Sequence, residues 1–373
     1  MGGYNTKREK PLWKRARGWL CFLMLSLMMA TLIFYSTSIL MSWPLPFWKI
    51  RSLSNHFYKP TPVGSVHAEA DPGMRGRKVQ VTVPELQSQN IDHSEYFVKY
   101  PHQYRFILDE PIRCHKENPF LVILIPVPPQ SRGARDIIRR TWGKDTTVQG
   151  QVVNYYFLLG LSKVSNGTEE PEEQILLESQ EHHDILQSEF LDSYKNLTIK
   201  TMLMFEWLSA RCPSTSYAMK VDSDIFLNLH NLVDVLLKAP RQLYMTGLVI
   251  RNAQVLRNPN SKWFLPATAF PELVYPPYPM GLGYVFSLDL AKRILEASAH
   301  IKAVYIEDVY VGLCMRHLGI ELRDPPRSGL FMSYMPFSID KCYWASVITT
   351  MLQNSEQLLD VWKVYKTQAQ SGC

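Results

Sequence analysis

The sequence predicts an α/β domain whose central sheet is mostly parallel. A continuous apolar run at residues 120–127 is typical of a strand that is buried on both faces of such a sheet. Strand-like and helix-like segments alternate from this run to residue 221. Two carboxylates, Asp222 and Asp224, directly follow the strand-like run at 217–221. Because ligands of open α/β sheets bind at the carboxyl ends of strands, we expect a binding site there.

The amino-terminal part of the chain predicts a membrane anchor at residues 19–43. This segment carries no charge and is long enough to cross a bilayer, which needs about 20 apolar residues. The basic residues that precede it are Lys7, Arg8, Lys10, Lys14, Arg15 and Arg17. Only Lys49 and Arg51 follow closely, so the positive-inside rule puts residues 1–18 in the cytosol and the rest in a lumen. The alternative is a buried core helix, although soluble helices of this length rarely lack charge.

The formal charge of +6 is concentrated in this cytosolic tail. Residues 1–18 carry six basic residues and one acidic residue, a net +5, which leaves +1 for the remainder. A nearly neutral lumenal part has no electrostatic reason to bind nucleic acid. Its apolar content, 46% over the whole chain, is sufficient for a large core.

Residues 44–115 predict a stem that connects the anchor to a domain at 116–373. The stem is rich in proline and glycine, carries scattered charges and shows little periodicity, which favours an extended linker.

Cysteines and glycosylation motifs agree with a lumenal location. The cysteines after the anchor are Cys114, Cys212, Cys314, Cys342 and Cys373. Disulfides persist in an oxidising lumen, and an odd number leaves at least one cysteine free or paired between chains. No pair has CxxC spacing, so we do not expect a structural zinc site. Asn166-Gly-Thr and Asn196-Leu-Thr are acceptor motifs for N-glycosylation.

The other elements of the domain follow from periodicity and turn residues. Up to the carboxylate pair we expect a helix over 131–143, a strand over 152–159, a Glu-rich polar stretch over 169–181 and a helix over 197–210. Beyond it we expect a helix over 231–238, a strand over 244–250, a helix over 288–299 and a helix that starts near Asp308 and ends at Gly319.

Three groups of polar residues are candidates for chemistry. Asp222 and Asp224, on either side of Ser223, can both reach one divalent cation that holds a diphosphate, although aspartates are also common where strands end in turns. Arg135 and Arg139 lie one helical turn apart and predict either a phosphate site or a solvated helix face.

The third group is Glu307 and Asp308, at the start of a helix. A carboxylate is an ordinary N-cap there, and the helix dipole favours it. The functional interpretation makes Asp308 a general base that takes a proton from an incoming hydroxyl, with Glu307 positioning it.

Two aromatic segments, 261–266 and 275–286, are punctuated by proline and glycine. Aromatic rings stack on sugars and on uracil, and glycine lets the backbone approach a ligand closely. Core packing is the competing explanation for each aromatic residue.

Taken together, five motifs resemble the β-1,3-glycosyltransferase family, nearest the β-1,3-galactosyltransferases. They are Arg135-Asp-Ile-Ile-Arg-Arg-Thr-Trp142, Asp192-Ser-Tyr-Lys-Asn-Leu-Thr198, Lys220-Val-Asp-Ser-Asp-Ile-Phe226, Tyr275-Pro-Pro277 and Glu307-Asp-Val-Tyr-Val-Gly-Leu-Cys314. The resemblance runs in order from about residue 118 to the end of the chain.

The resemblance implies a GT-A type nucleotide-sugar fold in a single-pass type II Golgi membrane protein. It implies Mn²⁺-dependent, inverting transfer from a UDP-sugar to a sugar hydroxyl, with Asp308 as the base and Glu307 beside it. By position, the metal and diphosphate motif is Lys220, Asp222, Ser223 and Asp224; the metal residues are Asp224 and Asp222, with Asp224 favoured over Asp222 as the direct ligand. The segments that line donor or acceptor contain Arg135, Arg139, Lys262, Trp263, Gly281, Gly283 and Tyr284.

Two positions depart from the pattern of this family. Met351 stands where relatives carry a histidine that looks like a further metal ligand, and Met is a poor ligand for a hard ion. Pro279-Met280 stands where relatives carry a cysteine followed by serine.

The leading function is transfer of galactose in a β-1,3 linkage to an N-acetylhexosamine end of a glycan on a glycoprotein or glycolipid. Relatives that transfer N-acetylglucosamine or N-acetylgalactosamine give one alternative. A catalytically weak Golgi protein that binds glycans or escorts an active enzyme gives another, and either a homo-oligomer or a hetero-oligomer is compatible with the sequence.

Overall fold

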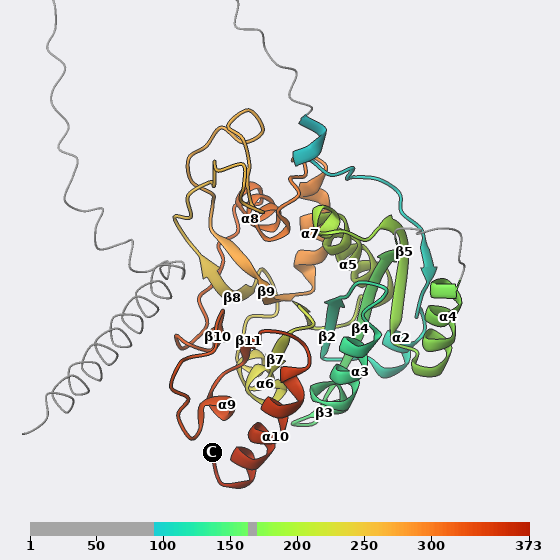
Figure 1. Cartoon of the computed structure of the whole chain (residues 1–373), viewed down its shortest axis with the longest axis vertical. Helices are drawn as coiled ribbons and strands as arrows, with labels where there is room; N and C mark the ends of the chain where they lie inside the picture. The colour runs from blue at the N-terminus through green and yellow to red at the C-terminus, as the bar shows by residue number, and fades with distance from the viewer. Residues whose placement is uncertain (1–92, 163–169) are drawn as a thin grey trace, which may run out of the picture. The chain divides into compact units, whose positions relative to one another are not determined.

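The computed structural model describes residues 93–162 and 170–373 (Figure 1). The predicted tail, the anchor, most of the stem and the first glycosylation motif, at Asn166, lie outside these residues. Within the two described ranges no helix is both long enough and apolar enough to cross a membrane.

An eight-stranded mixed sheet forms the centre of the domain. Its parallel middle contains β5 (Ile185–Leu191), β4 (Gln151–Leu161), β2 (Leu121–Pro126) and β6 (Tyr217–Val221), in this spatial order. Antiparallel strands flank it: β1 (Phe106–Leu108), β9 (Tyr278–Ser287), β8 (Met245–Ile250) and the short β3 (Thr147–Val148). The predicted α/β class with a largely parallel central sheet is confirmed.

Strand β2 is apolar on both sides because the two faces of the sheet bury different cores. Leu121, Ile123 and Ile125 belong to one core, whereas Val122 and Leu124 belong to the other, and each is at most 1% exposed. A continuous apolar run is therefore what this central position requires.

Helices cover both faces of the sheet (Figure 1). The core that contains Val122 also contains residues of α5 (Leu197–Arg211), α7 (Asp289–Ser298) and α8 (Glu307–His317). The opposite core contains residues of α3 (Arg132–Arg140), α4 (Glu170–His182), α6 (Leu229–Leu237) and α10 (Gln357–Gln370). The short helices are α2 (Arg113–Glu117), α9 (Tyr343–Ser346) and the 3₁₀ turns η3 (His93–Tyr96), η4 (Trp142–Lys144) and η5 (Tyr194–Asn196).

A second, three-stranded sheet brings the carboxyl-terminal part of the chain to the carboxylate motif. It contains β10 (Phe331–Met332), β11 (Thr349–Met351) and β7 (Ile225–Leu227). Met351 pairs with Ile225, and the amide of Leu352 donates to the carbonyl of Asp224 at 3.0 Å. The position that departs from the family pattern thus lies beside Asp224.

Strand β9 covers most of the aromatic segment 275–286, for which the sequence predicted no secondary structure. It pairs antiparallel with β6 and with β8, and its register with β8 shifts between Gly247 and Val249. Val249 is the partner of Pro279, which donates no backbone hydrogen bond. Pro279 is thus accommodated in the strand at this register shift.

The folded domain includes residues that were assigned to the stem. Strand β1 pairs with β5, and Cys114 forms a disulfide with Cys212 at the end of α5. The expected boundary at 115/116 therefore falls inside the folded unit. A second disulfide joins Cys342 to Cys373, and Cys314 is free and buried in α8, so the expected odd cysteine is found.

Candidate active site

A cavity of about 610 Å³ opens at the carboxyl ends of β2 and β6. Its walls come from the loop between β2 and α3, the first turn of α3, η5 with the start of α5, the motif Asp222-Ser223-Asp224, and residues 354–356. The carboxylate pair lies where the strand pattern predicts a ligand site.

Asp222 and Asp224 differ in their surroundings. Lys220 holds the Asp222 carboxylate, with 2.7 Å between Nζ and Oδ1. Burial and the nearby Asp222 carboxylate raise the pKa of Asp224. Two carboxylates on one wall of an open cavity, one of them without a full counter-charge, suit a divalent cation whose other ligands are phosphate oxygens.

Lys220 connects this pair to the other candidate carboxylates. Its Nζ lies 3.5 Å from Oε2 of Glu307 and donates to the carbonyl of Gly281. Burial lowers the pKa of Lys220, but the Asp222 and Glu307 carboxylates outweigh it and raise the pKa above its ordinary value. Lys220 therefore stays charged and links the strand-end carboxylates to the start of α8.

Glu307 and Asp308 occupy the first turn of α8, and the N-cap position belongs to Ile306. Oδ1 of Asp308 accepts the amide of Val309 at 2.8 Å, and Oδ2 accepts the amide of Gly281 at 3.1 Å. Burial and the Glu307 carboxylate raise the pKa of Asp308 to about 7. A carboxyl group with a pKa near neutrality is well suited to exchange a proton with a hydroxyl group.

The glycines of β9 allow close packing around these carboxylates. A Cβ on Gly281 would lie 3.2 Å from Oε2 of Glu307 and 3.5 Å from Oδ2 of Asp308. A Cβ on Gly283 would instead meet the side chains of Met219 and Val221 on β6. Gly281 belongs to the site, whereas Gly283 serves the contact between the two strands.

Tyr284 was expected to line the substrate site, but its side chain is fully buried. Its hydroxyl donates to Oε1 of Glu307 at 2.7 Å. Tyr284 therefore acts on the site through Glu307, because no ligand in the cavity can reach a side chain in this position.

Lys262 and Trp263 lie beside Tyr194, which lines the cavity. Trp263 is 46% exposed, and the Nζ of Lys262 lies 4.4 Å from the centroid of a Trp263 ring and 5.6 Å from that of Tyr194. Burial and the Asp308 carboxylate raise the pKa of Tyr194 to about 12. Tyr194 was not singled out from the sequence, although it lies within the motif at 192–198. Its signal was an aromatic residue in a polar turn just before a helix.

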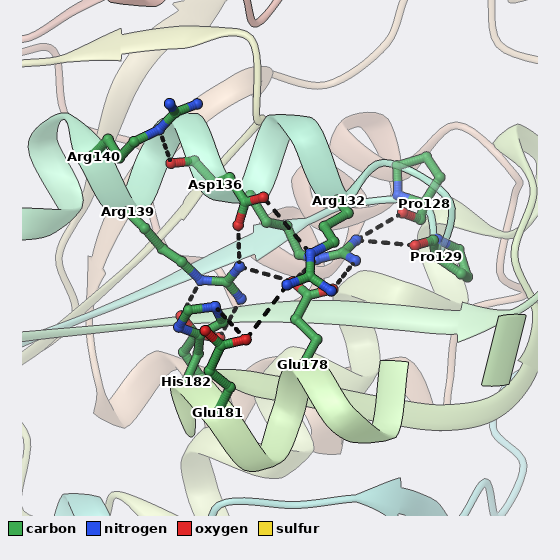
Figure 2. Close-up of polar contacts among 11 residues, drawn as sticks. Pro128, Pro129, Arg132, Asp136, Arg139, Arg140, Glu178, Glu181 and His182 are labelled. Carbon is green, nitrogen blue, oxygen red and sulfur yellow. Dashed lines mark hydrogen bonds and ion pairs between the residues drawn. The ribbon is translucent and has the colours of Figure 1, made fainter. Parts of the chain in front are cut away.

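Arg135 and Arg139 do not reach the cavity. Figure 2 shows the ion-pair network between α3 and α4 that contains them. Nε and Nη2 of Arg135 donate to the two oxygens of Glu178 at 2.7 and 2.6 Å. Arg139 contacts Glu178, Asp184 and Asp136. The sequence left a phosphate site and a solvated helix face as alternatives, and the structure shows neither. Protein carboxylates and, for Nη1 of Arg135, the carbonyls of Pro128 and Pro129 accept the hydrogen bonds of the two guanidinium groups.

The second glycosylation motif lies close to the cavity. Asn196 is partly exposed, and its amide nitrogen donates to the carbonyl of Leu191 at 2.8 Å. Leu197, the next residue, lines the cavity.

Paired carboxylates lie at a strand end of an open α/β sheet, and Lys220 links them to Glu307, the neighbour of the buried Asp308 whose pKa is raised. This arrangement is typical of an enzyme site rather than of a binding module. Comparison with known proteins gives the class: the chain belongs to the galactosyltransferase family. The family model described as Galactosyltransferase matches residues 133–326. The protein is therefore a glycosyltransferase, and specifically a hexosyltransferase.

Two similar relatives are named as beta-1,3-galactosyltransferases. Beta-1,3-galactosyltransferase 2 of Homo sapiens is 38% identical over 293 residues, which cover 77% of this chain and 69% of that protein. Beta-1,3-galactosyltransferase 1 of Mus musculus is 38% identical over 276 residues, which cover 73% of this chain and 82% of that protein. Among solved structures, the apo structure of the bifunctional glycosyltransferase WbbM aligns with a TM-score of 0.36 and 12% identity, covering 68% of this chain and 52% of that one. This structural likeness is too weak to support a conclusion.

Proposed function

We propose that the protein transfers galactose from UDP-galactose to the 3-hydroxyl of an N-acetylhexosamine-ended glycan, with inversion and in a β-1,3 linkage. The observation that carries this proposal is the chain of contacts from Asp222 through Lys220 to Glu307, beside Asp308. These contacts connect the carboxylate pair, as the proposed site for the diphosphate, to Asp308, as the proposed general base. The family and the names of the relatives at 38% identity support the choice of galactose.

In this proposal Asp224 and Asp222 hold a divalent cation, Mn²⁺, together with the diphosphate of the donor. The donor set fits, because two carboxylates leave most of the coordination sphere to phosphate oxygens and water. The bound ion would offset the charge that develops on the departing diphosphate. Lys220, already held by two carboxylates, keeps the Asp222 side chain oriented toward the cavity wall.

The proton of the acceptor is the task of Asp308. In inverting transfer, the acceptor hydroxyl attacks the donor sugar from the face opposite the diphosphate. The base must therefore lie on the same side as the acceptor hydroxyl. Burial and the Glu307 carboxylate raise the pKa of Asp308 and so strengthen it as a base. Tyr284 and Lys220 hold Glu307 in place. The rings of Trp263 and Tyr194, with Lys262 beside them, offer surfaces on which a sugar ring can stack.

The remaining parts of the proposal come from the sequence and the family. They are a GT-A type domain, a Golgi membrane location with the domain in the lumen, and an anchor at residues 19–43. A glycan on a glycoprotein or glycolipid is the acceptor.

The experiment is UDP release by the full chain in detergent. It is given UDP-galactose, UDP-N-acetylglucosamine or UDP-N-acetylgalactosamine, acceptors that end in an N-acetylhexosamine, and either Mn²⁺ or a chelator. We expect release from UDP-galactose only, dependent on both acceptor and Mn²⁺. Release from one of the other donors would overturn the choice of galactose. Silence with every donor, in a folded chain that binds glycan, would favour the escort function, for which Met351 beside Asp224 is the supporting observation.

A further inference from the structure

We propose that two buried cations, Lys200 and Arg135, are positioning residues that fix the loop between β2 and α3 and thereby shape the donor-binding wall of the cavity. The loop consists of residues 127–131. The inference rests on the proposed function, since it assigns these residues to the binding of the UDP part of the donor.

Lys200 binds this loop from α5. Its side chain is 1% exposed, and Nζ donates to the carbonyl of Val127 at 2.9 Å and to Oδ2 of Asp192 at 2.7 Å. The same Oδ2 accepts the amide of Gly160, at the end of β4, at 2.9 Å. One ammonium group thus ties α5 to the end of β2 directly and to the end of β4 through Asp192.

Arg135 binds the next two carbonyls from α3. Its Nη1 donates to the carbonyl of Pro128 at 3.3 Å and to that of Pro129 at 3.1 Å. The rest of its guanidinium group is held by Glu178, and the side chain is 1% exposed. Three consecutive main-chain carbonyls, at 127, 128 and 129, therefore have buried cationic donors.

The sequence of the loop explains why carbonyls are the groups held. Pro128 and Pro129 have no N–H group, so at these two positions the main chain can be anchored only through its oxygens. Pro128 and Ser131 line the cavity that also contains Asp222 and Asp224. A carbonyl that turned into this cavity would add negative partial charge where a diphosphate has to bind. The two cations keep these oxygens directed into the protein, together with the amide of Ser131, which donates to the carbonyl of Pro128 at 3.0 Å.

The role is positional because each cation already has its own counter-charge. Asp192 balances Lys200 and Glu178 balances Arg135, so the pairs add no net charge to attract a phosphate. Asp192 also lies two residues before Tyr194, which lines the cavity from another wall. Lys200 consequently sets the distance between two walls, that of the β2–α3 loop and that of η5.

The test compares two substitutions in one ion-pair network. Arg135→Lys keeps a positive charge for Glu178, but a single ammonium group cannot also satisfy the two proline carbonyls. Asp184→Asn is the control, because Asp184 is buried and contacts Arg139 in the same network without touching the loop. The thermal midpoint Tm, the Kd for UDP in the presence of Mn²⁺, and kcat and KM with UDP-galactose are measured on the full chain in detergent.

We expect Arg135→Lys to raise the Kd for UDP and the KM for the donor about tenfold, while kcat changes less than threefold. A tenfold rise in Kd is a loss of about 1.4 kcal/mol of binding free energy. Asp184→Asn lowers Tm, and its Kd for UDP stays within twofold of wild type. Lys200→Gln, whose side chain is too short to reach Val127, gives the same rise in KM as Arg135→Lys.

Two results would overturn the inference. One is an unchanged Kd for UDP in Arg135→Lys with a lowered Tm, and the other is an equal weakening of UDP binding in the Asp184→Asn control. Either would show that the network serves stability alone. Failure of the proposed function is distinguishable, because the wild-type chain itself would then bind no UDP.

Discussion

The pH dependence of transfer tests Asp308 as the general base. Its pKa is raised from 3.8 to about 7 by burial and by the Glu307 carboxylate. The base acts in its ionised form, so activity rises with pH through this pKa. The ionised fraction is about 0.1 at pH 6 and about 0.9 at pH 8, which predicts a roughly tenfold rise in kcat/KM. An aspartate of ordinary pKa would give a flat profile over this range.

The assay measures initial rates of UDP release by the full chain in detergent, at saturating Mn²⁺ and subsaturating UDP-galactose. Asp308→Asn preserves the size of the side chain but removes the base. We expect its kcat/KM to fall by about 10²–10⁴ and to lose the rise between pH 6 and pH 8. Binding of UDP is retained, because Asp308 does not line the cavity at the carboxylate pair.

A second variant checks the cause of the shifted pKa. Glu307→Gln removes the negative charge beside Asp308, so the pKa of Asp308 falls and the midpoint of the profile moves to lower pH. Two findings would refute the argument: a wild-type profile that is flat from pH 6 to pH 8, or an Asp308→Asn variant that keeps the wild-type pH step. The second would assign the titration to another group.

Three further predictions concern the surroundings of the site and the domain. The raised pKa of Asp224 means that its charged form is disfavoured in the folded chain. Asp224→Asn should therefore raise Tm slightly in the absence of metal. The same variant should bind Mn²⁺ at least about tenfold more weakly in a titration. Tyr284→Phe leaves the buried Glu307 without a donor at 2.7 Å and should cost about 1–3 kcal/mol of unfolding free energy in denaturant titration. Cys114→Ser opens the disulfide to Cys212, whose sequence separation is 98, and should cost about 2–5 kcal/mol in the same assay, whereas an unchanged midpoint would contradict this.

Sequence patterns predicted the parts of the fold that depend on neighbouring residues. The apolar run at 120–127 became β2, and the carboxylate pair followed β6 as expected, because burial on both faces and strand ends leave a direct mark on composition. Strand β9 was not predicted, because prolines and glycines interrupt its apolar pattern. Helix α4 was not predicted, because its many glutamates indicated only a polar stretch. Glu178 is nevertheless one of the most buried acidic residues of the described domain.

The fate of charged residues in the site could not be predicted, since it depends on partners far along the chain. From the sequence, Arg135 was equally compatible with a phosphate ligand and with a solvated helix face. Only the structure shows that its partner is Glu178. Lys220, in contrast to Arg135, does belong to the site. The motif at 220–226 identified this residue, but the sequence could not predict its contact with Glu307 on α8. A guanidinium or ammonium group carries the same local signal whether its partner is a substrate or a carboxylate of the protein.

The pairing of β11 with β7 has a consequence for when the protein can work. The backbone of Asp224 receives its hydrogen bond from Leu352, near the carboxyl terminus. During synthesis, the carboxylate pair therefore leaves the ribosome long before the strand that supports it. A chain stopped before residue 349 carries the carboxylate pair but lacks β11, which pairs with β7 beside it, and we expect such a chain to be inactive.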